Sequence, residues 1–354
     1  MQYSPQHGFT RLIAFGVENP FPLHGELDPD SIYFKKGTGY DSQYYAQIAL
    51  DPSMQDPEVQ ASLDAPSYRA RRIMMPWLAS MIGVENVSLV LNTFALINVV
   101  CWILFALWLA RYVNDLPRME AFTRWGVCMF SVGVLDSLRL ALTDFPAACL
   151  VVLIVYYAEQ QAKLKTWCLS IISVFTKETS VLALLALAPQ SFDWKQWARY
   201  GVYCLTIALP FGLWLLYLSQ HVTMNAQVSG NLHIPFEGMI KFARKCTSEI
   251  TSGNINVHNI FGLIAIASGL TQALAVALSF KWNALWVRVA IPFALIFIVA
   301  GDKVWGSTMA PLRIVLPLTC LIAVFLPKGR FFYSIMALTA LPSIHGVVRW
   351  IFNL

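Results

Sequence analysis

Long apolar segments, separated by short polar connections, follow one another from residue 87 to near the C-terminal end of the sequence. Stretches such as 89–110 are apolar on every side, which is typical of bilayer-spanning helices and not of the alternating strands of a membrane barrel. The pattern predicts an all-α, polytopic transmembrane helical bundle of about eight to ten spans. We place the apolar segments at roughly 87–110, 126–142, 145–161, 167–188, 200–218, 260–280, 284–300, 312–327 and 331–348.

Residues 1–86 differ from the rest, because they hold half of the acidic residues and no apolar stretch long enough to span a bilayer. We predict two domains: a non-cytoplasmic N-terminal region at 1–86 with interfacial helices, and a transmembrane helical domain at 87–354. An external tail of this length normally follows a signal or a first membrane helix, and 8–23 is neither. We therefore expect that a first transmembrane helix is missing through a late start in the gene model.

Composition supports the membrane assignment and excludes several other classes. Of the residues 57% are hydrophobic and 13% are charged, with a mean hydropathy of +0.57, whereas soluble chains carry about 25% charged residues. The net charge of +5 is scattered over short connections, so no nucleic-acid partner is expected. The seven cysteines stand singly without metal-ligand spacing, and we interpret them as small packed residues.

Orientation follows from the basic residues of the short loops, which should all be cytoplasmic. A single crossing at 167–188 would reverse this order for the later loops, whereas a hairpin turning at Lys177-Glu178 restores it. Half-spans of about ten residues cannot cross ~30 Å of hydrocarbon, so the hairpin should be re-entrant. The N-terminal region, both turns at Asp144 and Lys177, the 219–259 connection and the loop before Arg313 then share the non-cytoplasmic face. The basic residues used are Arg111, Arg118, Arg124, Lys163, Lys165, Lys195, Arg199, Lys281, Lys328 and Arg330.

Ionisable residues in or beside the apolar segments are candidates for function, since a charge at a bilayer centre costs about 2.5 to 3.5 kcal/mol on insertion scales. Asp144 precedes a helix start, where it is either functional or an N-terminal cap. Lys177 and Glu178 are adjacent, so they face different ways and each needs its own partner. The lysine suits a phosphate and the glutamate a metal or a sugar hydroxyl, unless both belong to a solvated turn. Arg313 suits bidentate phosphate binding.

The N-terminal region holds the densest signal, in two stretches at 39–52 and 66–77. The first reads Gly-Tyr-Asp-Ser-Gln-Tyr-Tyr and ends on Asp-Pro, which presents Asp41 near the start of a helix lying flat on the membrane. The second is Pro-Ser-Tyr-Arg-Ala-Arg-Arg-Ile-Met-Met-Pro-Trp, with three arginines in four positions. A helix cap plus an interfacial basic anchor also explains this pattern without chemistry.

These stretches resemble a family of bacterial multi-pass membrane proteins related to the GT-C glycosyltransferases, which use polyprenyl-phosphate sugars. The resemblance covers 39–77 closely and the rest by layout, through Thr143-Asp144, Thr176-Lys177-Glu178-Thr179 and Arg313 with Pro317 after it. Ser42 and Tyr44 stand where the family has glycine and phenylalanine. The resemblance implies a GT-C-like fold in the bacterial inner (cytoplasmic) membrane, with the active face non-cytoplasmic.

The resemblance also implies a reaction, namely inverting transfer of a sugar from a polyprenyl-phosphate donor to an envelope acceptor. Asp41 would be the general base, while Lys177 and Arg313 would hold the leaving phosphate. No cofactor is certain; a divalent metal stays open, because the second acidic residue common in GT-C enzymes is absent beside Asp41. Membrane lipids are expected partners, and the substrate-binding residues expected are Gln43, Tyr44, Tyr45, Arg69, Arg72, Asp144, Lys177, Glu178 and Arg313, with Arg71 beside them.

Two other functions stay open at this stage. A transporter or lipid flippase would also use intramembrane charges such as Asp136, Arg139, Lys177 and Glu178, but it predicts internal repeats, and the two halves show none. A non-catalytic component of envelope assembly, with a degenerate site, is compatible with Ser42. A single cavity containing Asp41, Lys177 and Arg313 would favour transfer, whereas a central path with alternating gates would favour transport.

Overall fold

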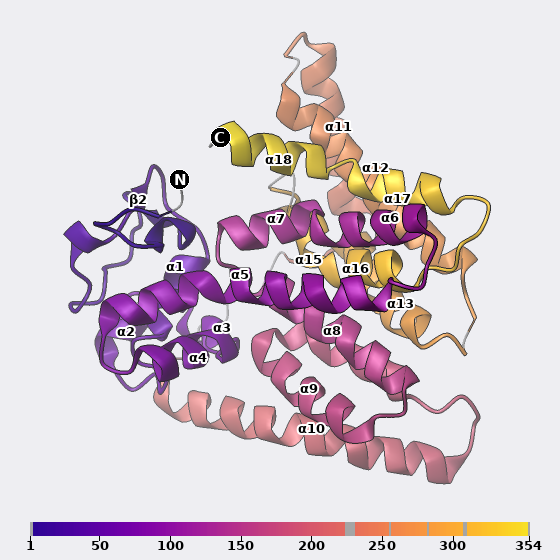
Figure 1. Cartoon of the computed structure of the whole chain (residues 1–354). Coiled ribbons are helices and arrows are strands. Elements are labelled where there is room, and N and C mark those ends of the chain that lie inside the picture. Colours follow the sequence, from indigo (N-terminus) through magenta and orange to yellow (C-terminus); the bar gives the residue numbers. More distant parts are fainter. Residues whose placement is uncertain (1–2, 224–230, 255, 282, 307–309, 353–354) are drawn as a thin grey trace.

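The computed structural model describes residues 3–223, 231–254, 256–281, 283–306 and 310–352. Helices account for 69% of the structure and strands for 2%, so the prediction of a mostly helical chain is confirmed. Figure 1 shows a small-element N-terminal region at one side and a body of longer helices at the other. The long helix α5 (Val87–Tyr112) runs from the first part into the second.

The N-terminal region folds around the short helix α1 (Ser42–Ile48), all of whose residues are buried. Tyr45 and Ile48 pack in one apolar core with Phe15 from a two-stranded parallel ribbon. The expectation that this helix lies flat on the membrane is therefore wrong, because protein surrounds it on every face. The other elements of the region are η1 (Thr10–Leu12), β1 (Phe15–Gly16), η2 (Pro29–Ser31), β2 (Phe34–Lys35), α2 (Pro57–Ala61), α3 (Pro66–Arg69) and α4 (Met74–Gly83).

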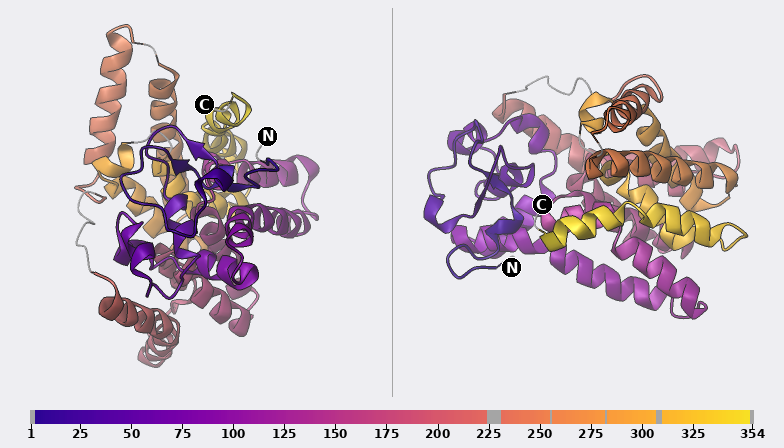
Figure 2. Two further views of the ribbon diagram at one scale, coloured as in Figure 1. Left: turned by 90° about the vertical axis from the view of Figure 1, so that its left-hand side faces the viewer. Right: turned by 90° about the horizontal axis from the view of Figure 1, so that it is seen from above.

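The helical body is packed around α8 (Asp144–Glu159) and α16 (Leu316–Phe325), which contact each other and are almost wholly buried. Figure 2 shows α11 (Glu237–Thr251) and α12 (Val257–Leu278) projecting beyond the other helices, and the two contact each other. The remaining elements are α6 (Arg118–Met129), α7 (Val132–Arg139), α9 (Lys163–Thr176), η3 (Glu178–Leu187), α10 (Trp194–His221), α13 (Leu285–Val299), α14 (Asp302–Trp305), α15 (Ala310–Ile314), α17 (Phe332–Ala340) and α18 (Ser343–Phe352).

Within the described residues, three helices are long and apolar enough to cross a membrane, namely α5, α10 and α12. Helix α10 makes the case most clearly, since its only buried residues are Ile207 and Leu218. Leucines along the same helix, among them Leu205 and Leu213, are about 60% exposed. An apolar surface of this length facing water would be unfavourable, whereas hydrocarbon accommodates it.

Several predicted segments are each divided in two. The segment 126–142 is divided between α6, which ends at Met129, and α7. Helix α6 also begins earlier than predicted, and the buried pair Glu120–Arg124 lies in this added part. The segment 312–327 divides at Val315, just before Pro317 in the first turn of α16. The last segment divides ahead of Pro342, which cannot continue a helix.

The segment 167–188 is also divided, at the predicted position. Helix α9 ends at Thr176, Lys177 is extended, and η3 begins at Glu178. The two helices contact each other. Whether the pair is re-entrant in a bilayer stays a prediction, but the turn places two charged side chains at one point.

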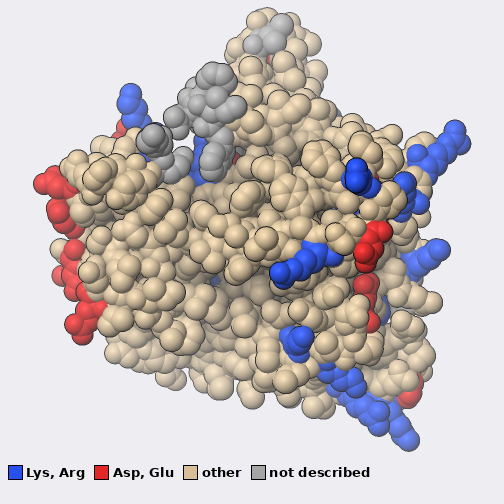
Figure 3. All heavy atoms as spheres, in the orientation of Figure 1, with Lys and Arg blue, Asp and Glu red and all other residues tan. Residues whose placement is uncertain are grey.

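Charged side chains are unevenly distributed over the face of the molecule that Figure 3 shows. In Figure 3 acidic side chains line the edge over the N-terminal region, and most basic ones lie toward the other edge. Exposed acids of the N-terminal region include Glu26, Asp28 and Glu58. The exposed basic residues of the helical body include Arg111, Arg118, Lys163, Lys165, Lys281, Lys328 and Arg330.

Candidate functional site

Four carboxylates and four cations from distant parts of the sequence meet in linked ion pairs where the N-terminal region joins the helical body. Four of these eight residues are buried and the other four are partly buried, and each pair brings together a different set of elements. We call this group the charged cluster. It consists of Asp41, Asp64, Arg69, Arg72, Asp144, Lys177, Glu178 and Arg313.

Asp41 lies at the N-terminal end of α1, and its side chain points to Arg69 instead of capping the helix. Arg69 Nη2 donates to Asp41 Oδ1 at 3.0 Å and to Asp64 Oδ2 at 2.7 Å, while Arg69 Nε donates to Asp64 Oδ1 at 2.8 Å. Gly39 makes the turn before Asp41, with a φ of +78° and no room for a side chain beside Ala14 O. The alternative interpretation of Asp41 as a helix cap is wrong, since its side chain forms no cap hydrogen bond.

The Asp41 carboxylate is ionised and reachable. Burial alone would raise its pKa, but the charges of Arg69 and Arg313 and the hydrogen bond from Arg69 outweigh burial, so the pKa of Asp41 lies below its usual value. The side chain keeps 34% of its surface exposed, compared with 9% for Asp144. Among the described residues, the only hydrogen bond to the Asp41 carboxylate goes to Oδ1. Oδ2 is therefore available to a ligand.

A second set of contacts joins both predicted phosphate ligands to Asp144. Lys177 Nζ lies 2.6 Å from Asp144 Oδ1, and Arg313 Nε lies 3.6 Å from Asp144 Oδ2. Arg313 Nη1 also donates to the Tyr40 hydroxyl at 2.7 Å, and its guanidinium lies over the Tyr40 ring, 5.1 Å from the centroid. Because Tyr40 precedes Asp41, one tyrosine links this set to the carboxylate of the first.

The contact between Arg313 and Asp144 is an ion pair without a hydrogen bond. Arg313 Nε is buried and has no hydrogen-bond partner among the described residues. Buried guanidinium donors are usually satisfied, so an unused N–H here is a donor available to an incoming anion. Asp144 itself is occupied by two cations, and its side chain does not cap α8, which excludes the interpretation of Asp144 as a cap alone.

Arg72 and Glu178 form the third set. The guanidinium donates from Nε and Nη2 to the two carboxylate oxygens, at 2.9 and 2.7 Å. The hydroxyls of Tyr45 and Tyr68 accept from the same guanidinium at 3.0 and 2.7 Å. Since Lys177 bonds Asp144 and Glu178 bonds Arg72, the prediction that each of these neighbours has its own partner is confirmed.

Several residues expected to bind substrate have structural contacts instead. Gln43 is buried and holds the N-terminal strands, because it accepts from Gly16 N at 3.1 Å and donates to Thr38 O at 2.9 Å. Tyr45 is 1% exposed and supports Arg72. Tyr44 is also buried, with its ring against the Arg69 guanidinium at 4.9 Å. The geometry therefore gives these three residues a supporting position behind the carboxylates.

The arginines at 69 and 72 do not form an interfacial anchor either. Both are buried and paired with carboxylates inside the protein, so neither is available to lipid headgroups. Arg71 between them is half-buried. The basic anchor suggested by three arginines in four positions is wrong for two of them, because Arg69, at the end of α3, and Arg72, three residues later, both point inward to carboxylates.

Sequence reasoning missed three members of the site. Asp64, Tyr40 and Tyr68 each contact a predicted residue directly. Tyr40 and Tyr68 stand beside or within the quoted motifs, so their position in those motifs was the available signal. Nothing in the local pattern distinguishes Asp64 from the other acids of the region.

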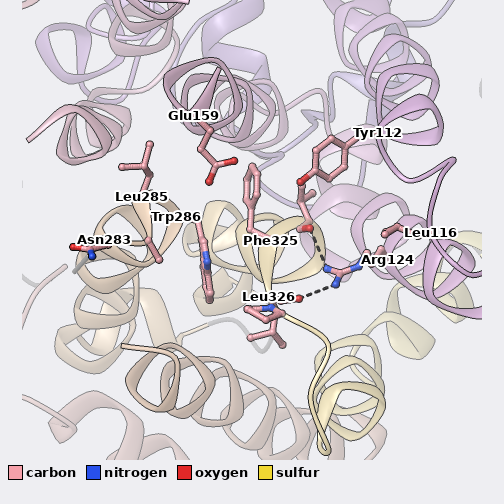
Figure 4. Close-up of a pocket in the computed structure, with 12 residues that line it drawn as sticks. Tyr112, Leu116, Arg124, Glu159, Asn283, Leu285, Trp286, Phe325 and Leu326 are labelled. Atoms are coloured by element: carbon pink, nitrogen blue, oxygen red, sulfur yellow. Dashed lines mark hydrogen bonds between the residues drawn. The ribbon is translucent and has the colours of Figure 1, made fainter. Parts of the chain in front are cut away.

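A cavity of about 590 Å³ lies far along the helical body, where α5, α8 and α16 end and α13 begins. Figure 4 shows Glu159, Tyr112 and Trp286 around it, and Arg124 bonded to backbone oxygens at its wall. Arg124 was expected in a cytoplasmic loop, but it is buried inside α6. This cavity contains no residue of the charged cluster.

Two further observations concern possible metal ligands and similarity to known proteins. Within the described ranges, no three His, Cys, Asp or Glu side chains are grouped to hold a metal ion. Searches against protein families, curated proteins and solved structures found no match for the chain. The charged cluster is therefore the observation on which a functional proposal has to rest.

Proposed function

We propose that the chain is a membrane glycosyltransferase of GT-C type, which transfers a sugar from a polyprenyl-phosphate donor to an envelope acceptor with inversion. The observation that carries the proposal is the charged cluster at the junction of two regions, in which Lys177 and Arg313 both contact Asp144, and Arg313 also bonds the hydroxyl of Tyr40, the neighbour of Asp41. The proposed fold is a polytopic bundle in the bacterial inner membrane. Its charged cluster faces the non-cytoplasmic side, because the exposed basic residues gather at the other end.

The reaction requires one base and one phosphate site. The acceptor oxygen attacks the anomeric carbon, the bond from that carbon to the phosphate oxygen breaks, and the phosphate leaves with the electron pair. Asp41 takes the acceptor proton at Oδ2. Its lowered pKa keeps it ionised, and the acceptor oxygen becomes acidic as its new bond forms, so a weak base suffices. Lys177 and Arg313, whose Nε makes no hydrogen bond within the described residues, stabilise the charge that gathers on the phosphate.

A lipid-linked donor also fits the surface beside the charged cluster. An apolar cavity of about 810 Å³ lies between α4, α9 and α10, and we call it the apolar groove. Its lining includes Ile73, next to Arg72 in sequence, and Phe175, two residues before Lys177. A polyprenyl chain in this groove would therefore place its phosphate close to the basic side chains. Further lining residues are Met74, Trp77, Met81, Leu213 and Trp214.

Purified chain incubated with a panel of radiolabelled polyprenyl-phosphate sugars tests the proposal. Label should leave the lipid fraction with the wild-type chain and not with Asp41→Asn. Asp30→Asn is a matched control, because Asp30 is an exposed carboxylate of the same region outside the charged cluster. Retention of label with every donor, or equal release by wild type and Asp41→Asn, would contradict the assignment.

A further inference from the structure

A second polar cavity, of about 320 Å³, lies between α11, the beginning of α12 and α14. None of its lining residues belongs to the charged cluster. Its walls carry ammonium, carboxylate, amide and indole groups together, unlike the apolar groove beside the charged cluster. The polar and aromatic lining residues are Lys241, Phe242, Lys245, Glu249, Asn256, His258, Asn259, Asp302 and Trp305.

Trp305 is the unusual member of this lining. The side chain is 3% exposed and is packed between Phe242 and Phe297, with ring centroids 5.4 and 5.5 Å away. Its indole Nε1 is buried and has no hydrogen-bond partner among the described residues. A buried indole N–H is normally bonded, and leaving such a donor unpaired costs about 1–3 kcal/mol. A ligand oxygen in the cavity would remove that cost.

The cavity walls are tied together without a ligand. Lys241 bridges Glu237 on its own helix, at 2.8 Å, to Asp302 on α14, at 3.2 Å. Asn259 on α12 donates to Glu249 on α11 at 2.7 Å. These contacts join α11 to both α14 and α12, so the polar groups of the lining are positioned before a ligand binds. Little conformational entropy is then lost when a ligand binds.

The chemistry of the lining selects a class of ligand. The lining carries two ammonium groups, Lys241 and Lys245, and two carboxylates, Glu249 and Asp302, so a small ion finds no excess charge of one sign. Donors and acceptors are nevertheless both present in the lining, at Trp305, Lys245 and Asp302. A neutral molecule with several hydroxyl groups, such as a sugar, uses donors and acceptors together.

We propose that this cavity binds a saccharide. The saccharide is of the class to which the acceptor of the transfer belongs, an identification that rests on the proposed function. Helix α14 ends eight residues before Arg313 of the charged cluster, which puts the saccharide cavity on the segment leading into the phosphate site. Hydroxyl binding itself depends only on the lining.

Direct binding tests the saccharide cavity without any transfer assay. Purified full-length chain in detergent is titrated by saturation-transfer NMR with free glucose, mannose, galactose and N-acetylglucosamine. At least one sugar should bind, and Trp305→Phe, which keeps a ring and removes the N–H, should bind it at least tenfold more weakly. Asp302→Asn, at the half-exposed rim, should also weaken binding. Trp194→Phe is the matched control, because Trp194 is exposed outside the cavity and should bind as wild type.

The possible results separate the two proposals. Absence of binding by all four sugars, or unchanged affinity in both Trp305→Phe and Asp302→Asn, overturns the saccharide cavity whatever the transfer assay shows. Binding lost in these variants while no donor releases its label supports the cavity and contradicts the glycosyltransferase. Trp305→Phe must keep the wild-type unfolding temperature for its result to count, and Asp302→Asn supplies the answer if it does not.

Discussion

Two arginines of the helical body, Arg124 and Arg313, stand in similar surroundings and are used differently. Each guanidinium lies over an aromatic ring, Phe332 for the first and Tyr40 for the second, at 4.7 and 5.1 Å from the centroid. Each also faces a nearly buried carboxylate. They lie in different parts of the body, Arg124 at the cavity of Figure 4 and Arg313 in the charged cluster.

Their hydrogen bonds separate them. Arg124 donates to Glu120 from Nε and Nη2, and its remaining donors reach the carbonyls of Ala323, Val324 and Leu326, which close the C-terminal end of α16. Arg313 donates to one hydroxyl, and its Nε, although ion-paired with Asp144 at 3.6 Å, has no hydrogen-bond partner in the described part of the chain. A saturated guanidinium stabilises the fold, whereas an unsaturated one retains binding capacity.

The largest expected effect concerns the carboxylate beside the unsaturated arginine. Asp41→Asn should lower sugar transfer by about 10²- to 10⁴-fold, because the amide cannot accept the proton. The unfolding temperature should change little, since Arg69 keeps its contact with Asp64. Label release from polyprenyl-phosphate sugars measures the first effect and circular dichroism on heating measures the second. Wild-type transfer by this variant would show that Asp41 is not the base.

Arg313→Lys comes next and tests whether the free donor is used. A lysine keeps the charge near Asp144 but loses the planar guanidinium, so transfer should fall by about 10²- to 10³-fold with folding retained. Initial rates at saturating donor give the readout. Arg330→Lys, an exposed arginine at the opposite end, is the control and should behave as wild type. Equal rates for all three proteins would remove Arg313 from the phosphate site.

Arg124→Gln should mainly lower the stability of the fold, in contrast to Arg313→Lys, which should mainly lower transfer. The variant leaves buried Glu120 without its main partner and α16 without its cap, so the free energy of unfolding should fall by roughly 3–5 kcal/mol. Arg313→Gln should lose less stability, because Lys177 still neutralises Asp144. Denaturant titration of both variants gives the comparison. A larger loss at Arg313 than at Arg124 would reverse the roles inferred from their hydrogen bonds.

The smallest effect concerns pH. A carboxyl whose folded pKa is lowered adds stability that is fully present above its unfolded pKa, about 3.9 for aspartate, and is lost as pH falls through the folded value. Because the pKa of Asp41 is lowered, wild type should lose more stability than Asp41→Asn on acidification below about pH 4. Unfolding temperatures of both proteins between about pH 2.5 and 7 measure this. Parallel curves would mean that the Asp41–Arg69 pair does not stabilise the fold.

The sequence predicts local features of this molecule well and long-range pairing poorly. Hydrophobic pattern alone located α5 within two residues, since an apolar run bounded by Asn86 and Arg111 has few alternatives. Orientation rules also required a turn at Lys177, and the helix breaks there. The bounds of α5 follow from one local apolar segment, and the turn at Lys177 follows from the side of the membrane on which the basic loops lie. Both features can be read directly from the sequence.

The pairing of charges could not be read in the same way. Arg69 and Arg72 look like one basic run, yet Arg69 at the end of α3 pairs with Asp41, and Arg72, three residues later, pairs with Glu178, more than one hundred residues away. Likewise, Arg124 resembles a loop residue until the end of α16 is placed beside it. Such partners are chosen by packing of distant helices, which local periodicity does not encode.

Helix α10 forms one wall of the apolar groove and is also the candidate span with the smallest buried share. Because few residues of α10 pack against the rest of the protein, the helix is held weakly. Its outer face contacts hydrocarbon if the helix crosses the bilayer. A long-chain lipid can then pass sideways from the surrounding leaflet into the groove, without extraction into water. A change in the lipid composition around the protein should therefore alter the rate at which long-chain lipids enter the groove beside α10 more than it alters the stability of the fold.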